Sequence, residues 1–423
     1  MMRVAGINKD FDIEISLVGS KSESNRALMI CHYGGFAARV KNLSTSDDTI
    51  LLSNILRKIS METVATSFHD NPAIIDCANA GSVLRFLATA LSFRNGDYIL
   101  TGCGRMLKRP VGDLVETLRA MGASIEYLGE AGFPPLKIHG KTFAKTVDEM
   151  SRINVNISKS SQFASSILLM LPTVKTIPET ILHLDGDLSS LPYIDMTIDI
   201  MRDFGAKVER SGREIAVQPS EYQNVEYVVE SDWTCASCWY EFVALSEHGR
   251  VKIRNLKLDS KQGDAVAAEW FEQLGVKTVC DGNDIIIEKN NSIVGRQVSF
   301  DFINNPDLYP AIAATCAGLN IKGRFTGLRN LVHKESDRVA AMAAELSKIN
   351  SAETCHGASP PIKLDSHDDH RIAMALAPLA MKIGAIEINN AEVVSKSYPN
   401  FWEEMKNVVS TESLGRSGKI SLA

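Results

Sequence analysis

The feature that most constrains the fold of this chain is a supersecondary step that recurs along it. At five places an aspartate begins an apolar run of helical period, and a glycine or small polar residue ends the run before a short strand-like segment. Asp is a good helix N-cap, and Gly or Asn readily adopts the left-handed backbone that ends a helix. These runs cover residues 48–60, 113–122, 195–205, 264–275 and 337–350. Their ends recur about every 70 residues, so a chain of 423 residues holds about six units.

Six such units exceed one compact domain of ordinary size, so we expect two or more domains. The alternation of helices and short strands predicts an α/β protein, and six units suggest two pseudo-symmetric domains of three units each. A cleft between two such domains is a frequent place for a small-molecule site.

Composition narrows the class of function. The hydrophobic fraction of 45% and charged fraction of 23% are those of an ordinary soluble protein. A net charge of −6 argues against a nucleic-acid or membrane-surface partner. No run approaches the roughly 18 apolar residues of a membrane span, and the first ten residues lack the apolar core of a signal peptide. We therefore expect a cytoplasmic protein without nucleic-acid or membrane partners.

The eight cysteines are scattered, which favours reduced thiols over a disulfide framework. Cys235 and Cys238 form a lone C-x-x-C, and a zinc ribbon needs a second such pair. We interpret them as two small, half-buried thiols. Since no metal-ligand spacing, P-loop or dinucleotide-binding motif occurs either, we expect neither metal nor cofactor.

The stretch from Gly19 to Arg26 has the character of an anion site. It follows a strand-like segment, 13–17, and precedes an apolar run that predicts a helix. Backbone N–H groups and the positive end of the helix dipole point out of such a turn. Lys21 adds a point charge and Arg26 a planar fork. For this stretch alone, a serine-capped helix with exposed basic residues is an equally good interpretation.

Similar clusters of cations, hydroxyls and acids recur, nearly all before predicted helices. They cover residues 79–85, 105–110, 158–162, 333–338, 368–371 and 396–399. Each alone suits a solvated surface, but together they favour a metal-free enzyme that acts on polyanionic small molecules in a cleft lined by Arg and Lys. Asp307 and Glu335 are candidates for proton transfer there.

Taken together, these motifs closely resemble the 5-enolpyruvylshikimate-3-phosphate synthase family. The matching stretches are 19–26, 79–85, 105–113, 160–163, 190–195, 306–307, 330–338, 369–371 and 396–399. They follow the family's order and span nearly the whole chain. The resemblance implies a two-domain inside-out α/β barrel, each domain built of three pseudo-repeated βαβαββ-type units.

The resemblance also divides the chain. Residues 1–19 plus 231–423 would form domain one, which carries both termini, the phosphoenolpyruvate-side cations and the acid/base residues. Residues 20–230 would form domain two, on the shikimate 3-phosphate side.

The implied reaction moves the enolpyruvyl group of phosphoenolpyruvate onto the 5-hydroxyl of shikimate 3-phosphate and releases phosphate. It passes through a non-covalent tetrahedral intermediate and leads to chorismate and the aromatic amino acids. We expect a monomer whose small-molecule substrates are these two, and the resemblance implies inhibition by glyphosate at the phosphoenolpyruvate site.

The resemblance assigns roles to single residues. Asp307 takes the proton of the 5-hydroxyl, and Lys21 and Glu335 handle protons on the enolpyruvyl side, with their division of labour open. Residues implied for phosphoenolpyruvate are Lys21, Gly81, Arg109, Gln162, Arg338, Arg371 and Lys396. Those implied for shikimate 3-phosphate are Lys21, Ser22, Arg26, Ser160, Ser161, Gln162, Ser190, Tyr193, Asp307, Asn330 and Lys334.

Simpler interpretations stay open for three of these positions. Asp307 follows a proline and could be a helix cap, Tyr193 could belong to the core, and His370 could be structural and orient Arg371. Among whole functions, the UDP-N-acetylglucosamine enolpyruvyl transferase would carry Lys-Asn in place of Lys21-Ser22. A catalytically silent metabolite-binding paralogue would lack acid/base residues.

The chain departs from the family pattern in a few places. Segments 60–76 and 350–366 are shorter than in many relatives, so edge hairpins there are expected to be missing or rebuilt. Phe86 follows Arg85 where Pro or Leu is common, and Cys235 stands where Ser is commoner. None of these departures removes an implied catalytic group.

Overall fold

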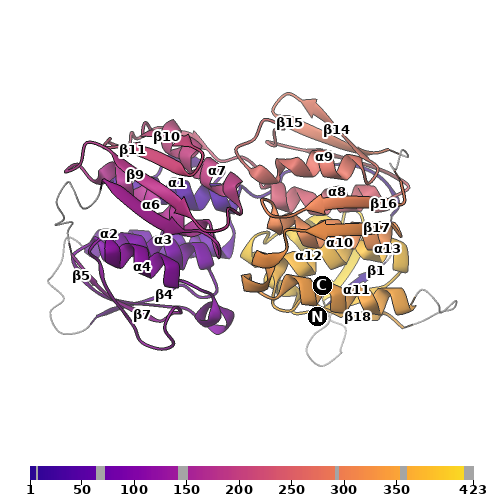
Figure 1. Cartoon of the computed structure of the whole chain (residues 1–423). Coiled ribbons are helices and arrows are strands. Elements are labelled where there is room, and N and C mark those ends of the chain that lie inside the picture. Colours follow the sequence, from indigo (N-terminus) through magenta and orange to yellow (C-terminus); the bar gives the residue numbers. More distant parts are fainter. Residues whose placement is uncertain (6–7, 63–71, 142–150, 291–294, 353–359, 414–423) are drawn as a thin grey trace. The chain divides into compact units, whose positions relative to one another are not determined.

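The computed structural model describes residues 1–5, 8–62, 72–141, 151–290, 295–352 and 360–413, which form two compact units (Figure 1). The first unit comprises Met1–Ser20, Thr45–Asp47 and Glu230–Ala423, and the second comprises Lys21–Ser44 and Asp48–Val229. Among the described residues, no helix is both long and apolar enough to cross a membrane.

The second unit contains two four-stranded sheets and one pair of strands. One sheet has the order β4 (Ala73–Asp76), β5 (Gly96–Thr101), β7 (Leu136–Gly140), β6 (Ser124–Tyr127). The other has the order β8 (Arg152–Asn156), β9 (Thr180–Asp185), β11 (Glu214–Gln218), β10 (Lys207–Ser211). The pair is β3 (Val40–Lys41) with β12 (Tyr227–Val228).

The first unit repeats this plan. Its four-stranded sheets are β18 (Ile362–Asp365), β19 (Ile386–Asn389), β1 (Met2–Ala5), β20 (Ser410–Ser413), and β2 (Asp10–Ile15), β13 (His248–Ile253), β15 (Asp284–Lys289), β14 (Val276–Asp281). Its pair is β16 (Gln297–Asp301) with β17 (Lys322–Thr326).

All six sheets begin with the same motif. Each four-stranded sheet has one parallel pair, such as β4 with β5, followed by two antiparallel pairings. The pairs β3–β12 and β16–β17 hold the parallel motif alone. Three such sheets in each unit confirm the predicted α/β fold of repeated units. The rebuilding expected in segments 60–76 and 350–366 falls largely on residues 63–71 and 353–359, which lie outside the described residues.

The helices of the second unit are α1 (Lys21–Gly34), α2 (Asp47–Glu62), α3 (Gly81–Ser92), α4 (Gly112–Ala120), α6 (Gln162–Met170) and α7 (Leu191–Asp203), with short turns η1 (Gly104–Lys108) and η2 (Leu171–Thr173). The α-helices of the first unit are α8 (Trp233–Leu245), α9 (Ala267–Glu272), α10 (Tyr309–Gly318), α11 (Arg338–Ala352), α12 (His370–Leu376), α13 (Ala380–Ile383) and α14 (Phe401–Met405). Its 3-10 turns are η3 (Gly263–Val266), η4 (Pro306–Leu308), η5 (Arg329–His333), η6 (Ala377–Leu379) and η7 (Ala391–Lys396).

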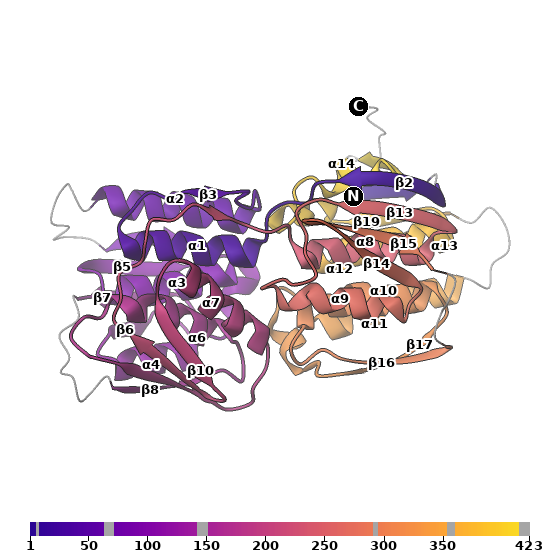
Figure 2. The same cartoon turned by 90° about the horizontal axis from the view of Figure 1, so that it is seen from above.

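Within each unit the sheets lie outside and the helices inside (Figures 1 and 2). Sequence explains this arrangement, because the central helices are largely apolar or small-sided on all faces, as expected of a buried helix. Every residue of α8 is buried, and all of α3 is buried except Ser82. The polar helix N-termini emerge from this core, and these ends carry the predicted site residues.

The predicted helix ends are partly confirmed. Gly122, Gly205 and Gly275 have φ values of 99°, 85° and 82°, the left-handed backbone expected of helix-ending glycines. The predicted ends at residues 60 and 350 are wrong, because α2 and α11 continue to Glu62 and Ala352.

Two predicted helix starts are also wrong. Helix α7 begins at Leu191 rather than Asp195, because Pro192 suits a first turn and Ser190 precedes it with a φ of 54°. Asp264 lies within the 3-10 turn η3, and the helix proper begins only at Ala267. Helix α1 starts at Lys21, so most of the stretch from Gly19 to Arg26 is helical.

Candidate active site

In the first unit, Asp307 lies among three cations. Its Oδ1 accepts hydrogen bonds from Lys334 Nζ at 3.0 Å and Arg338 Nη1 at 2.7 Å, and Arg371 Nη2 lies 3.9 Å from its Oδ2. Burial raises the pKa of Asp307, but the field of these cations outweighs burial and holds that pKa well below 3.8. The carboxylate therefore faces cations, whereas Asn305 takes the N-cap position of η4.

Arg338 is held by three carboxylates. Its Nε and Nη2 donate to Asp369 Oδ2 and Oδ1 at 2.8 and 3.2 Å, and Nη2 also donates to Glu335 Oε2 at 3.1 Å. Together with the bond to Asp307, this side chain, which is 1% exposed, uses four hydrogen bonds to stay in one geometry. Burial lowers the pKa of Arg338, but Asp369, Asp307 and Glu335 more than offset burial, so Arg338 stays charged.

Asp369 explains why α11 and α12 present their cations together. It is the N-cap of α12 and accepts from the backbone N of Arg371 at 3.0 Å, while Ser336 Oγ donates to its Oδ2 at 3.1 Å. One buried carboxylate thus fixes Arg338 and the first turn that carries Arg371. The sequence motif 368–371 contained this signal, since an Asp before an apolar run is an N-cap candidate, but its bidentate partner could not be read from it.

Arg371 has spare hydrogen-bonding capacity. Its side chain is 5% exposed, and its Nε and Nη1 have no hydrogen-bond partner among the described residues. Such a buried fork suits a carboxylate or phosphate. Lys396, at the end of η7, lies 3.9 Å from Glu335 Oε1 and adds a further cation to the cluster. Asn330 lies in η5, close in sequence to Lys334.

In the second unit, Arg26 joins three helices. From α1 it donates to Thr197 Oγ1 at 2.7 Å and Tyr193 O at 3.0 Å on α7, and to Ser165 Oγ at 3.2 Å on α6. Burial lowers its pKa to about 10. Its guanidinium lies over the ring of Phe86, 5.7 Å from the centroid. The unusual residue of α3 therefore packs beneath a predicted substrate-binding cation.

These contacts bring helix N-termini together. The bonds of Arg26 to Ser165 and Tyr193 fall in the first turns of α6 and α7, and Arg26 Nη1 donates to Ser22 O at 2.9 Å in the first turn of α1. The predicted site serines follow the same pattern: Ser22 lies in α1, Ser160 and Ser161 precede α6, and Ser190 precedes α7. Converging helix N-termini form a setting for a phosphate.

Arg85 connects two predicted phosphoenolpyruvate-binding segments and was missed as a site residue. Its Nη1 donates to Gln162 Oε1 at 2.7 Å, and its Nη2 donates to Pro110 O at 3.1 Å, next to Arg109. Its guanidinium stacks over Phe163, 5.3 Å from the ring centroid. Because the carbonyl side of the Gln162 amide faces Arg85, the amide NH2 is directed elsewhere.

Gly81 lets Arg109 approach the start of α3. A Cβ on Gly81 would lie 2.7 Å from Arg109 Cζ and Nη1, which is shorter than a van der Waals contact allows. The absence of a side chain thus sets the position of a predicted anion-binding fork. Lys21, at the start of α1, pairs with Asp48 at 3.5 Å, and this acid is a second residue that the sequence analysis did not place in the site.

We assign no catalytic role to three other residues that the sequence singled out, Cys235, Cys238 and His370. Cys235 and Cys238 are fully buried rather than half-buried, and burial raises the pKa of both thiols. His370 is buried, with Nδ1 3.7 Å from Asp369 Oδ1. Among the described residues, no group of three or more potential metal ligands is found.

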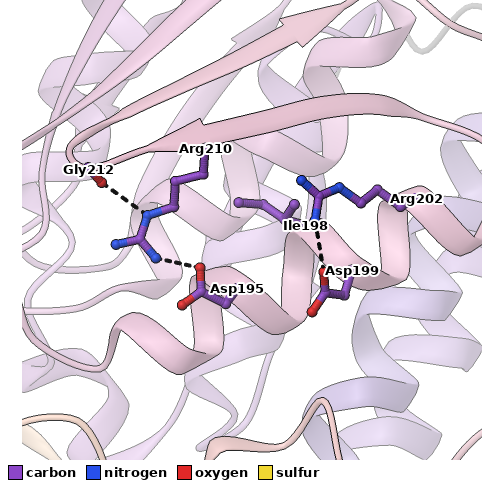
Figure 3. Close-up of a pocket in the computed structure, with 6 residues that line it drawn as sticks. All are labelled: Asp195, Ile198, Asp199, Arg202, Arg210 and Gly212. Carbon is purple, nitrogen blue, oxygen red and sulfur yellow. Dashed lines mark hydrogen bonds and ion pairs between the residues drawn. The ribbon is translucent and has the colours of Figure 1, made fainter.

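A polar pocket on the surface of the second unit is separate from these clusters. Figure 3 shows Arg210 and Arg202 beside Asp195 and Asp199 of α7, and each arginine forms an ion pair with one of these acids. Both arginines are thereby neutralised, and no predicted site residue lines the pocket. We therefore assign it no part in substrate binding.

The comparisons with known proteins bear on the whole chain. The family model described as EPSP synthase (3-phosphoshikimate 1-carboxyvinyltransferase) matches residues 7–405. The 3-phosphoshikimate 1-carboxyvinyltransferase of Bacteroides fragilis strain YCH46 is 38% identical over 93% of this chain and 94% of its own length. The protein of the same name from Aliivibrio fischeri strain MJ11 is 34% identical over 94% and 97%.

Solved structures share the fold. The EPSP synthase from Acinetobacter baumannii has a TM-score of 0.71 at 22% identity and covers 97% of this chain and 100% of its own. The enolpyruvyl transferase NikO from Streptomyces tendae has a TM-score of 0.66 at 15% identity, over 97% and 98%. With a family model that spans nearly the whole chain and relatives above one-third identity, this chain belongs to the EPSP synthase (3-phosphoshikimate 1-carboxyvinyltransferase) family.

Proposed function

We propose that this chain transfers the enolpyruvyl group of phosphoenolpyruvate to the 5-hydroxyl of shikimate 3-phosphate and releases phosphate. The observation that carries this proposal is the buried cluster in which Asp307 meets Lys334, Arg338 and Arg371. It supplies a carboxylate for proton transfer and cations for anionic substrates within one set of contacts. The family match over residues 7–405 supports the choice of substrates.

The first unit would bind phosphoenolpyruvate and carries Asp307 and Glu335 as acid/base groups. Arg371 offers its Nε and Nη1, while Arg338 and Lys396 add charge. We also assign Arg109, Gln162 and Gly81 to this substrate. Arg forks suit these ligands because they bind two oxygens at once.

Asp307 would act as the base for the 5-hydroxyl. Its three cations make it a weak base, since they hold its pKa well below 3.8. Substrate phosphate and carboxylate groups bound to the same cations would offset their field and raise that pKa. The carboxylate would thus gain basicity when both substrates are in place.

Protons on the enolpyruvyl side would pass through Glu335 and Lys21. C3 of phosphoenolpyruvate gains a proton as the 5-oxygen attacks C2, which gives the tetrahedral intermediate. Phosphate then leaves with the C–O bond electrons, and a methyl proton is lost. Glu335 contacts Arg338 and lies near Lys396, among the cations assigned to this substrate.

Shikimate 3-phosphate would bind at the converging helix ends of the second unit, through Ser22, Arg26, Ser160, Ser161, Ser190 and Tyr193, with Lys21 and Gln162 between the ligands. We also assign Asn330, Lys334 and Asp307 to this substrate. In this proposal residues 1–19 plus 231–423 form the domain with Asp307 and Glu335, and residues 20–230 form the domain that carries Lys21 and holds shikimate 3-phosphate. We place this monomeric enzyme, without cofactor, in the cytoplasm.

A phosphate-release assay tests the proposal. Phosphate should appear only when phosphoenolpyruvate and shikimate 3-phosphate are both present, and EDTA should leave the rate unchanged. UDP-N-acetylglucosamine, offered as an alternative acceptor, should give no release. Activity with that acceptor, or none with shikimate 3-phosphate, would overturn the proposal.

A further inference from the structure

Asp264 is a buried carboxylate that no step of the proposed reaction uses. It lies in η3 and is 4% exposed. Its Oδ2 accepts a hydrogen bond from Thr234 Oγ1 at 2.6 Å, and its Oδ1 accepts one from Asn305 Nδ2 at 3.1 Å. A buried carboxylate is costly unless its oxygens are bonded, so these two contacts account for much of its tolerance in the core.

Asn305 leads directly to Asp307. It is the N-cap of η4, and its carbonyl accepts from Leu308 N at 3.2 Å, which closes the turn that contains Asp307. The bond from Asn305 to Asp264 therefore fixes the entry to this turn. A displacement there would alter the 2.7 and 3.0 Å contacts of Asp307 with Arg338 and Lys334.

The hydrogen bond between Asp264 and Thr234 connects Asp264 to the buried helix α8. Thr234 lies in the first turn of the fully buried α8, where Asp232 caps Cys235 N at 2.9 Å. Gln262, two residues before Asp264, bonds the same helix start through Ser231 O at 2.7 Å and Trp233 N at 3.0 Å. The segment that carries Asp264 is thus tied to α8 at three points.

Asp264 also lies within the electrostatic reach of the cluster. Burial raises its pKa and the negative charge of Asp307 raises it further, whereas the hydrogen bonds from Thr234 and Asn305 and the charge of Arg371 lower it. Asp264 therefore interacts with Asp307 and Arg371 through charge, and with Thr234 and Asn305 through hydrogen bonds.

We propose that Asp264 is a positioning residue for Asp307. Through Thr234 and Asn305 it anchors the turn of η4 to the first turn of α8. This inference rests on the proposed function, because the position of Asp307 matters only if its carboxylate takes part in the reaction.

The test compares variants that break or keep the link. Asp264→Ala removes both bonds, and Asn305→Ala removes only the arm that leads to Asp307. Asp264→Asn keeps the geometry, since its amide oxygen accepts from Asn305 and its NH2 donates to the Thr234 hydroxyl. Asp301→Ala is the control, because Asp301 is an exposed aspartate of the same segment that accepts a local hydrogen bond from Ile303 N.

Phosphate release gives kcat and KM for both substrates, and thermal melting reports folding. Asp264→Ala and Asn305→Ala should lower kcat on the order of 10- to 100-fold, since small misplacement of a reacting group has effects of that size. The KM values should change by less than about 3-fold, and Asp264→Asn should retain kcat within the same margin. Asp301→Ala should behave as the unmodified chain.

The double variant Asp264→Ala/Asn305→Ala should be no slower than the slower single variant, because both changes break one link. Losses that multiply, or a normal kcat for Asn305→Ala, would overturn the inference. If Asp264→Ala does not fold, Asn305→Ala and Asp264→Asn still decide it. An unmodified chain that releases no phosphate would instead refute the proposed function, and this inference with it.

Discussion

Arg338 and Asp369 form a two-point pair in which Nε and Nη2 donate to the two carboxylate oxygens at 2.8 and 3.2 Å. Both side chains are buried, at 1% and 0% exposure. The pair joins the start of α11 to the start of α12, so two cations of the cluster hold their places before any ligand arrives.

This pair should contribute strongly to stability. Asp369→Asn should lower the free energy of unfolding by about 3 kcal/mol, because a buried guanidinium loses one of its compensating charges. Urea unfolding measures the change. Asp368→Asn is the matched control, since Asp368 is exposed and adjacent in sequence to Asp369 but takes no part in the pair with Arg338. This control substitution should change the free energy of unfolding by no more than about 0.5 kcal/mol. Equal effects of the two substitutions would contradict the role of the pair.

Asp307→Asn should separate binding from chemistry. The amide keeps the size of the side chain but cannot accept the 5-hydroxyl proton, so kcat should fall on the order of 100-fold or more. Substrate dissociation constants, measured by calorimetry, should not rise, because the three cations lose a carboxylate that competes with the substrates. A variant with near-normal kcat would show that Asp307 does not act as the base.

Glu241 should make stability depend on pH. This carboxyl of α8 is fully buried, its oxygens have no hydrogen-bond partner among the described residues, and burial raises its pKa well above 4.5. The folded state therefore holds its proton more tightly than the unfolded state. Its contribution to stability is complete below about pH 4.5 and is lost as the pH rises toward the folded pKa, by up to about 1.4 kcal/mol per pH unit.

Glu241→Gln should remove this slope. Urea unfolding at intervals from pH 5 to pH 8 should show similar stability for both chains at the acid end and a growing advantage of the variant above it. Glu247→Gln, which changes an exposed glutamate close to the end of the same helix, should leave the slope intact. A constant difference between Glu241→Gln and the unmodified chain across the range would show that ionisation of Glu241 is not the cause.

Gly81→Ala should weaken glyphosate more than phosphoenolpyruvate. The expected competition between the two ligands places glyphosate, which is one bond longer between phosphorus and carboxyl carbon, beside Gly81 and Arg109. The added methyl would meet the Arg109 guanidinium at 2.7 Å, so this fork must shift, and overpacking of this kind costs about 1–3 kcal/mol. Inhibition constants and KM for phosphoenolpyruvate in both proteins measure the effect, and equal inhibition constants would exclude it.

The fold was predictable where its causes are local. Gly122, Gly205 and Gly275 end helices because of their own backbone freedom, so the repeat could be recognised from the chain alone. The predicted start of α7 was wrong because Ser190 adopts a left-handed backbone, which cannot be predicted from a serine in the sequence.

The site was predictable in its residue types and less so in its connections. Arg371 and Asp307 stand in recognisable motifs, but Asp369 and Arg85 act through partners on other helices. Phe86 was identified as unusual, and only packing shows that its ring lies against Arg26. Such pairings depend on how helices meet, which periodicity within one segment does not encode.

The way Arg338 is neutralised has a consequence for ligand choice. Its charge is balanced by Asp307, Glu335 and Asp369, which lie at hydrogen-bond distance. A small ion such as chloride that approaches Arg338 must compete with fixed carboxylates and gains little. A molecule with several negative groups can exchange partners with several cations at once. If Arg338 binds substrate as proposed, internal pairing would favour multiply charged metabolites over the salts of the cell before any shape-specific contact is made.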